Sequence, residues 1–408
     1  MGRIKVAVTG AAGQVGSVLV SRMLQIPDID PVAICRNIIS GGVVHSSAPG
    51  CEIRIGSITK PDSAQKILGD CEAIVNCALA MISGQPRESR FQNKAMIDSF
   101  SQIKRLKTLI HLSSLAVYGG FIDSSRSRRN TFENPRPDND YGKSKLYIER
   151  HAKRMCISRQ LNHFLLRIGH VIGANMDRSR QLIEYAQDLN FSLPFSGELP
   201  SNTIHVEHLA AMIISLISST VPSGTYNVAD KDKTWRSVLD WHTQALGIPP
   251  VKGMALDKSN HLKVLYRKQS LLRDIVSWLG SLSILKLIKY PAIFEFAYNL
   301  LAMTPTPIAT RIKTAYKCKY VRRQIAAINY HGDEMIRPYF FSDAMPGRYL
   351  ELSLGSSPER PAEEELSKQL RDWFLMFSQP KPFSNPVSEN LNKTMLSNTS
   401  NVSPIAIS

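Results

Sequence analysis

The fold is decided by the stretch Ile4-Lys5-Val6-Ala7-Val8-Thr9-Gly10-Ala11-Ala12-Gly13-Gln14-Val15-Gly16. Its first half is apolar, which predicts a buried strand, and its second half holds three glycines before an apolar helical pattern. Such glycines allow a tight turn, a close approach of backbone to a pyrophosphate, and close packing of helix on strand. The N-terminus of the next helix would face the phosphates. The stretch therefore predicts a dinucleotide-binding βαβ unit.

A second stretch, residues 140–145, places Tyr141 and Lys145 four residues apart, which stacks both side chains on one face of a helix. Of the 13 tyrosines, only Tyr141 has a lysine four residues later. A free phenol titrates near pH ~10, and we expect the nearby ammonium to lower that pKa. The pair would exchange a proton with a hydroxyl while hydride moves to or from the same carbon. The alternative is an exposed tyrosine and lysine on a helix surface.

A third stretch, Leu109–Gly119, is an apolar run that ends in Ser113 and Ser114. At the carboxyl end of a parallel strand, these hydroxyls would point into the ligand crevice. The alternative is an ordinary turn.

The three stretches together resemble, in order and spacing, the extended short-chain dehydrogenase/reductases, the NAD(P)-dependent epimerase/dehydratase family. The resemblance continues at residues 167–173, 203–210 and 224–228 and covers about the first 250 residues. It implies an α/β fold: a Rossmann-type doubly wound parallel sheet with a smaller C-terminal substrate domain, whose elements begin near residue 170. We expect a helical, basic extension at 251–378, as substrate lid or membrane-surface region, and a disordered tail at 379–408.

The resemblance also implies roles for individual residues. Tyr141 is expected to be the acid/base, Lys145 to hold the nicotinamide ribose, and Ser114 to contact the substrate hydroxyl. His170 stands where sugar epimerases of the family have a substrate-contacting asparagine; the alternative is a structural histidine. The expected cofactor-binding residues are Gly10, Gly13, Gln14, Val15, Gly16, Arg36, Cys77, Ala78 and Lys145.

Arg36 bears on the choice of cofactor. It follows the predicted second strand, Val32–Cys35, where NAD enzymes usually carry an acid for the ribose 2′-hydroxyl and an arginine accommodates a 2′-phosphate. We therefore expect NADP(H) to be preferred, with NAD(H) also compatible.

Composition sets further limits. The 408 residues are 43% hydrophobic, and the six cysteines form no C-x-x-C pair, which favours a reducing compartment and predicts no metal site. The chain opens directly on a strand, which argues against a signal peptide, and no apolar run is long enough for a spanning helix. We expect a cytoplasmic protein.

The positive charge is concentrated near the C-terminal side. Residues 251–330 hold 14 Lys/Arg and three acids, so 14 − 3 = +11 of the net +16 lies there. Residues 275–303 within this region are mostly apolar. This combination predicts peripheral binding to the inner face of an anionic membrane, which co-sedimentation with anionic vesicles would test. The alternative is a helical lid with solvated lysines. Nucleic acid is disfavoured as a partner, and a homodimer is compatible with the sequence.

The sequence leaves three functions open. The first is an NAD(P)-dependent oxidoreductase or epimerase acting on a secondary alcohol or ketone of a nucleotide- or lipid-linked sugar. The second is a reductase or dehydrogenase of a hydrophobic, sterol- or isoprenoid-like alcohol. The third is a non-catalytic nucleotide-binding protein, which the intact Ser114–Tyr141–Lys145 set disfavours. Sugar dehydration is also disfavoured, because Leu115 and Ala116 stand where family dehydratases have an Asp-Glu pair.

Overall fold

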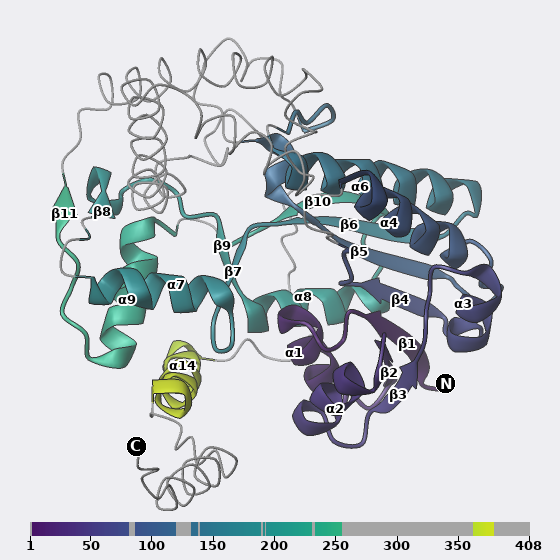
Figure 1. Cartoon of the computed structure of the whole chain (residues 1–408), viewed down its shortest axis with the longest axis horizontal. Helices are drawn as coiled ribbons and strands as arrows, with labels where there is room; N and C mark the ends of the chain where they lie inside the picture. The colour runs from purple at the N-terminus through teal and green to yellow at the C-terminus, as the bar shows by residue number, and fades with distance from the viewer. Residues whose placement is uncertain are drawn as a thin grey trace, which may run out of the picture.

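The computed structural model describes residues 2–80, 86–119, 132–137, 139–188, 191, 193–230, 233–254 and 362–378. These residues form a central sheet with helices on both faces and, beside it, a smaller group of strands and helices (Figure 1).

The main sheet has seven strands in the order β10-β6-β5-β4-β1-β2-β3, and all neighbouring strands are parallel. They are β1 (Ile4–Thr9), β2 (Ile29–Cys35), β3 (Glu52–Ile55), β4 (Ala73–Asn76), β5 (Thr108–Ser114), β6 (Asn162–Ile168) and β10 (Gly224–Val228). The chain runs outward from β1 to β3 and then returns to β4 on the other side of β1. This reversal is the switch point of a doubly wound sheet, where ligands bind at the carboxyl ends of the strands. The predicted fold class is confirmed.

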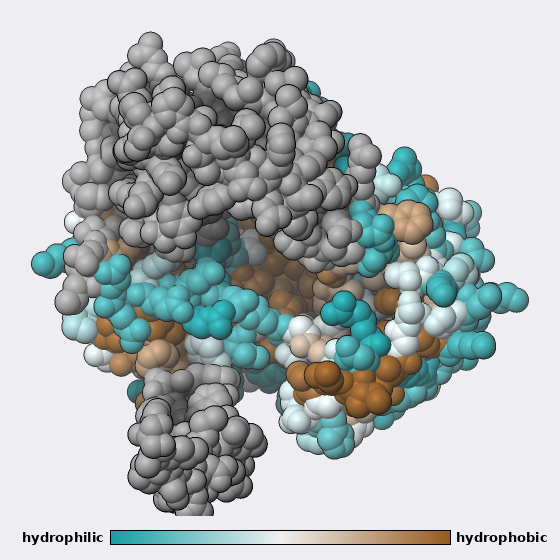
Figure 2. All heavy atoms as spheres, viewed as in Figure 1, coloured by the Kyte–Doolittle hydropathy of each residue, from teal (hydrophilic) through white to brown (hydrophobic). Residues whose placement is uncertain are grey.

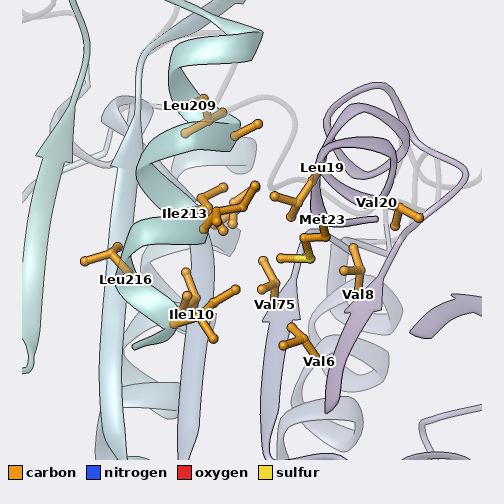
Figure 3. Packing of buried hydrophobic residues seen from close by; sticks show 14 of the residues in the cluster. Val6, Val8, Leu19, Val20, Met23, Val75, Ile110, Leu209, Ile213 and Leu216 are labelled. Carbon is orange, nitrogen blue, oxygen red and sulfur yellow. The ribbon is translucent and has the colours of Figure 1, made fainter. Parts of the chain in front are cut away.

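Helices cover both faces because successive strand residues point to opposite sides. Val6 and Val8 belong to the core under α1 (Gln14–Met23), α2 (Ile38–Ser47) and α8 (Val206–Ile217). Ala7 belongs to the core under α3 (Pro61–Leu68), α4 (Pro86–Phe100) and α6 (Asp140–Ser158). On the first face, Figure 3 shows Leu19 of α1 opposite Ile213 of α8, over the strands.

The smaller group contains two short parallel pairs. β7 (His170–Ile172) pairs with β9 (Thr203–His205), and β8 (Leu193–Pro194) pairs with β11 (Gly253–Met254). Around them lie α7 (Asp177–Gln187), α9 (Trp235–Leu246), α14 (Glu363–Ser378) and the 3-10 turn η2 (Phe195–Gly197); a second 3-10 turn, η1 (Leu115–Tyr118), follows β5.

The last described helix, α14, packs on α9 although more than one hundred residues separate them in the sequence (Figure 1). The indole nitrogen of Trp241 donates to the hydroxyl of Ser367 at 2.9 Å, and Leu370 is completely buried. The buried side of α14 therefore packs on α9.

One element boundary differs from the sequence prediction. The second strand was predicted at Val32–Cys35, but β2 begins at Ile29 and includes Pro31, which pairs with Val6 of β1. Pairing of β2 with β3 begins only one residue later, at Val32. Proline is tolerated there because only one side of β2 is paired at that point, so no ladder hydrogen bond from its nitrogen is lost.

Several predictions concern residues outside the described part of the chain: the apolar 275–303 segment with most of the basic excess, and the 379–408 tail. They remain predictions, as does the domain boundary at 250. In the described part, no helix combines the length and hydropathy needed to cross a membrane.

Candidate active site

The glycine-rich turn between β1 and α1 has the geometry of a phosphate cradle. Gly10 has a φ of +71°, and the amide of Gly13 donates to the carbonyl of Gly10 at 2.9 Å. A Cβ on Gly16 would collide with that same carbonyl, so helix and turn approach as closely as glycine allows. The first amides of α1, at Gln14 and Val15, have no acceptor within the helix and can bind an anion. The described residues therefore fit the pyrophosphate of a dinucleotide.

Cys77 and Ala78 lie against this cradle, as the sequence predicts. A Cβ on Gly10 would stand 3.0 Å from the nitrogen of Ala78 and 3.1 Å from the carbonyl carbon of Cys77. Burial raises the pKa of the Cys77 thiol to about 12, so it stays protonated and acts as a neutral wall.

Arg36 directly follows β2, the strand next to β1, and is exposed. It has no hydrogen-bond or ion-pair partner in the described part of the chain, so its guanidinium is available to an anion. Ile38 and Ile39 follow on α2, and each is 80% exposed. Figure 2 shows an apolar patch on the side of the molecule where α2 lies.

The first turn of α6 carries the tyrosine–lysine pair. The side chain of Asn139 caps the helix by accepting from the amide of Gly142 at 2.7 Å. A side chain at Gly142 would collide with the carbonyl of Ala116, so this turn lies directly against η1. Lys145 Nζ is 5.9 Å from the centre of the Tyr141 ring, which confirms that the two residues share one face.

Lys145 is almost completely buried. Its ammonium donates to the carbonyl of Leu112 on β5 at 2.7 Å. Burial lowers its pKa to about 8, and the negative charge of Glu149 opposes this shift.

The pKa of Tyr141 differs from the prediction. Desolvation raises it above the ordinary phenol value, and hydrogen bonding with the Ser114 hydroxyl opposes that rise; this holds although Tyr141 is 39% exposed. Lys145 does not lower it, because the ammonium bonds to Leu112 instead. The expectation of a lysine-activated phenolate is wrong for this structure: Tyr141 is a neutral phenol beside Ser114.

A buried ion pair behind this face was not predicted from the sequence. Glu149 lies one helical turn after Lys145, and its carboxylate accepts from Arg167 of β6 at 2.6 Å and from the hydroxyl of Ser113 at 2.7 Å. Both charged side chains are at most 5% exposed. Burial alone would lower the pKa of Arg167, but hydrogen bonding and the charge of Glu149 outweigh it, so the pKa is raised. The spacing of Tyr141, Lys145 and Glu149 at four-residue steps was the available signal.

Arg167 also gathers the chain around η1. Its guanidinium lies 5.0 Å from the ring centres of both Tyr118 and Phe132. It donates to the Tyr118 hydroxyl at 2.7 Å, and that hydroxyl donates to Asn227 of β10 at 2.7 Å. One cation thus joins β6, η1, α6 and β10 immediately behind the proposed catalytic residues.

A second buried polar group, also missed, lies under the cradle. Asn76 accepts from the Thr9 hydroxyl at 2.6 Å and its amide contacts Nδ1 of His111 at 3.0 Å. Because the Asn76 oxygen is already an acceptor, its nitrogen donates and His111 Nδ1 accepts. Burial lowers the pKa of His111 to about 3, so the ring is neutral.

His170 begins β7, next to Gly169. A Cβ on Gly169 would approach Leu115 of η1 at 3.3 Å, so this strand starts beside the segment that follows Ser114. Arg178 Nη2 lies 3.3 Å from His170 Nδ1, and the Trp235 ring lies 5.5 Å away. His170 is thus fixed by its neighbours. In the described part of the chain, no group of His, Cys, Asp or Glu is arranged to hold a metal.

Comparison with known families decides the identity of the fold. The model described as "NAD dependent epimerase/dehydratase family" matches residues 6–229, more than half of the 408 residues. The chain belongs to this family. As a family member it is an NAD-dependent enzyme of the extended short-chain dehydrogenase type, as the resemblance implied.

Solved structures share this fold at low identity. A UDP-N-acetylglucosamine 4-epimerase from Bacillus cereus is 20% identical with a TM-score of 0.50, over 62% of this chain and 85% of that one. A UDP-glucuronic acid 4-epimerase from Bacillus cereus, in complex with NAD, is 17% identical with a TM-score of 0.50, over 61% of this chain and 86% of that one. Vestitone reductase from alfalfa is 15% identical with a TM-score of 0.51, over 63% of this chain and 86% of that one. A search of curated proteins finds no match. At these identities the likeness shows the fold alone.

The buried pair yields a first prediction. Glu149→Gln leaves Arg167 buried without a counter-charge and should lower the free energy of unfolding by about 3–5 kcal/mol, whereas the double variant Glu149→Met/Arg167→Met should recover most of that loss. Urea denaturation measures both. As a control, Arg180→Met breaks the exposed Arg180–Asp177 pair and should change stability by less than about 1 kcal/mol. If Glu149→Gln lowers the free energy of unfolding by no more than the control variant does, the buried pair does not have the stabilising role expected of it.

Lys145 yields a second prediction. Its pKa is about 8 in the folded protein and near ~10.4 when unfolded, so between these values the unfolded state binds more protons. This group therefore makes stability rise with pH, by roughly 2 kcal/mol from pH 8 to 10. Denaturation at several pH values should show this rise in the wild type and its loss in Lys145→Met. Subtracting the variant's pH profile from that of the wild type cancels the contribution of all other titrating groups. Parallel pH profiles would show that Lys145 is not desolvated.

Proposed function

We propose that this family member transfers hydride at a secondary alcohol or ketone of a nucleotide- or lipid-linked sugar, using NADP(H) in preference to NAD(H). The observation that carries the proposal is the convergence of Ser114, Tyr141 and Lys145. Lys145 Nζ lies 5.9 Å from the Tyr141 ring centre, and the Ser114 hydroxyl is hydrogen-bonded to the Tyr141 phenol. The glycine cradle opens beside them, because Cys77 and Ala78 contact the cradle and the ammonium of Lys145 acts electrostatically on Cys77.

Each residue then has a distinct task. Ser114 orients the substrate oxygen, and Tyr141 exchanges a proton with it. Because the pKa of Tyr141 is raised, the phenol is protonated at neutral pH and is ready to donate. Lys145, charged below pH about 8, is placed to hold the ribose of the cofactor. The nicotinamide, when bound, supplies or accepts the hydride.

The two residues that follow Ser114 help to distinguish epimerisation or reduction from dehydration. Leu115 and Ala116 are the first two residues of η1, and their side chains carry no group that can move a proton. The elimination of water from a sugar needs such groups, so an epimerase or a simple reductase fits these side chains better than a dehydratase. His170, fixed by Arg178 and Trp235, is the proposed substrate contact from the smaller group of elements.

A reductase of a hydrophobic alcohol is the alternative, since it would use the same three residues. The state of the cofactor in the purified protein separates the two. An epimerase regenerates its cofactor in each turnover and is expected to retain it, whereas a reductase must exchange it. A homodimer remains a further proposal, for which sedimentation velocity is the measurement.

Tyr141→Phe tests the proposed acid/base. General acid–base catalysis contributes ~10²–10⁴-fold, so the variant should lose activity by about that factor and keep its cofactor affinity within about twofold. Activity is screened with UDP-glucose, UDP-N-acetylglucosamine and UDP-glucuronic acid in the presence of NADP(H) or NAD(H), followed at the nicotinamide absorbance or by product separation. On any substrate turned over, a variant rate within about threefold of wild type would remove Tyr141 from the mechanism.

Arg36 tests the cofactor preference. A charge-assisted bond to the 2′-phosphate is worth ~1.5–3 kcal/mol, so NADPH should bind about tenfold or more tightly than NADH at low ionic strength. Fluorescence titration measures both affinities. Arg36→Ala should abolish the preference, whereas Lys104→Ala, which removes another exposed cation, should preserve it. Equal affinities in the wild type, or an unchanged ratio in Arg36→Ala, would overturn the assignment.

A further inference from the structure

The ammonium of Lys145 is a buried charge that the sheet satisfies only in part. The residue is 6% exposed, and its ammonium donates to the carbonyl of Leu112 on β5 at 2.7 Å. An ammonium has three hydrogens to donate, and within the described residues this is the one hydrogen bond that it makes. A charge taken out of water in this way needs an opposite charge nearby to remain ionised.

Glu149 is placed to supply that opposite charge. It lies one helical turn after Lys145 on α6, so the two side chains share one face of the helix. Two consecutive residues of β5 bind them: the carbonyl of Leu112 accepts from Lys145, and the hydroxyl of Ser113 donates to Glu149 at 2.7 Å. Because the Glu149 side chain is 5% exposed, water screens its attraction for the ammonium less than it would at the surface.

The other titratable groups around this ammonium are neutral. Burial raises the pKa of the Cys77 thiol, at the end of β4, to about 12, and it lowers the pKa of the His111 ring, on β5, to about 3. Tyr141, one turn before Lys145, keeps its proton because desolvation raises its pKa. In the part of the chain that the structure describes, Glu149 is therefore the ionised acid that acts on Lys145.

Arg167 of β6 keeps this carboxylate ionised. The carboxylate accepts from two nitrogens of the Arg167 guanidinium, at 2.6 and 3.1 Å. Hydrogen bonds to the charged form of a group, together with an opposite charge, favour that form even where the group is buried. The pKa of Lys145 responds to the charge of Glu149 and not to that of Arg167, so the negative member of the pair dominates at the ammonium.

We propose that Glu149 is a positioning residue of this site, which keeps the ammonium of Lys145 in its charged form for the ribose of the cofactor. The inference rests on the proposed function, because it takes Lys145 as the residue that holds the ribose. Glu149 touches neither cofactor nor substrate and acts through Lys145. Loss of its carboxylate therefore weakens cofactor binding at a pH at which the wild-type ammonium is still charged.

The pH dependence of NADH affinity in the full-length protein tests this role. NADH is the probe because the 2′-phosphate of NADPH titrates near pH ~6 and would overlap with Lys145. Charge-assisted hydrogen bonds are roughly twice as strong as neutral ones, so wild-type affinity should fall about fivefold. The fall should be centred near pH 8, the pKa of Lys145, and should be absent in Lys145→Met. An opposite charge close by shifts a pKa by ~1–3 units, so Glu149→Gln should move the midpoint down by about one pH unit.

Two further variants control this measurement. Glu184→Gln makes the same change at an exposed position on α7 and should leave the midpoint where it is in the wild type. If Glu149→Gln does not fold, Glu149→Met/Arg167→Met removes the same carboxylate together with its partner. The midpoint should again move down, because the pKa of Lys145 responds to Glu149 and not to Arg167. An unchanged midpoint in whichever of these two variants folds would overturn the proposal.

Denaturation without cofactor separates a failure of this inference from a failure of the proposed function. The rise of stability with pH reports Lys145 directly, and Glu149→Gln should make that rise begin about one pH unit lower. A shift in both the stability and the NADH profiles supports the proposal. No shift in either overturns it and leaves Lys145 assigned to the ribose. A shifted stability profile with the same NADH profile in wild type and Lys145→Met removes Lys145 from the ribose, and the proposal falls with that part of the proposed function.

Discussion

The proposed catalytic side of the molecule depends on the buried ion pair between Arg167 and Glu149. Glu149 extends from the same face of α6 as Tyr141 and Lys145, and its carboxylate is bound to Arg167 of β6 and to Ser113 of β5. These contacts fix the rotation of α6 about its axis, which in turn sets where the phenol and the ammonium lie. A buried pair of this kind contributes little net stability but is costly to break, which makes its geometry highly restrictive.

The two halves of the proposed site are built in different ways. The cofactor cradle is local: one strand, one turn and one helix within residues 4–23, closed by contact with the end of β4. The proposed catalytic half is assembled from distant segments, since Ser114, Tyr141 and the Arg167 network come from β5, α6 and β6. Lys145 connects the halves, because its ammonium bonds to Leu112 on β5 while its charge acts on Cys77 at the cradle.

Desolvation is the force that sets the chemical state of these groups. It lowers the pKa of Lys145 to about 8 and that of His111 to about 3, and it raises that of Tyr141. The proposed site therefore holds a neutral phenol and a lysine that loses its charge near pH 8, and the His111 ring under the cradle is neutral. A proton-donating tyrosine is the form needed to reduce a ketone, which is one direction of the chemistry open to a member of this family.

The sequence by itself determined the fold class, the glycine cradle and the pairing of Tyr141 with Lys145, because each rests on local periodicity or on a fixed spacing within one element. It did not determine the pKa of Tyr141, since the direction in which Lys145 points depends on the carbonyl of Leu112, which is brought there by β5. The same holds for Arg167 with Glu149 and for Asn76 with His111. Each of these joins residues far apart in the chain, and only the packing of the sheet and its helices decides which polar groups lose water and which partners they meet.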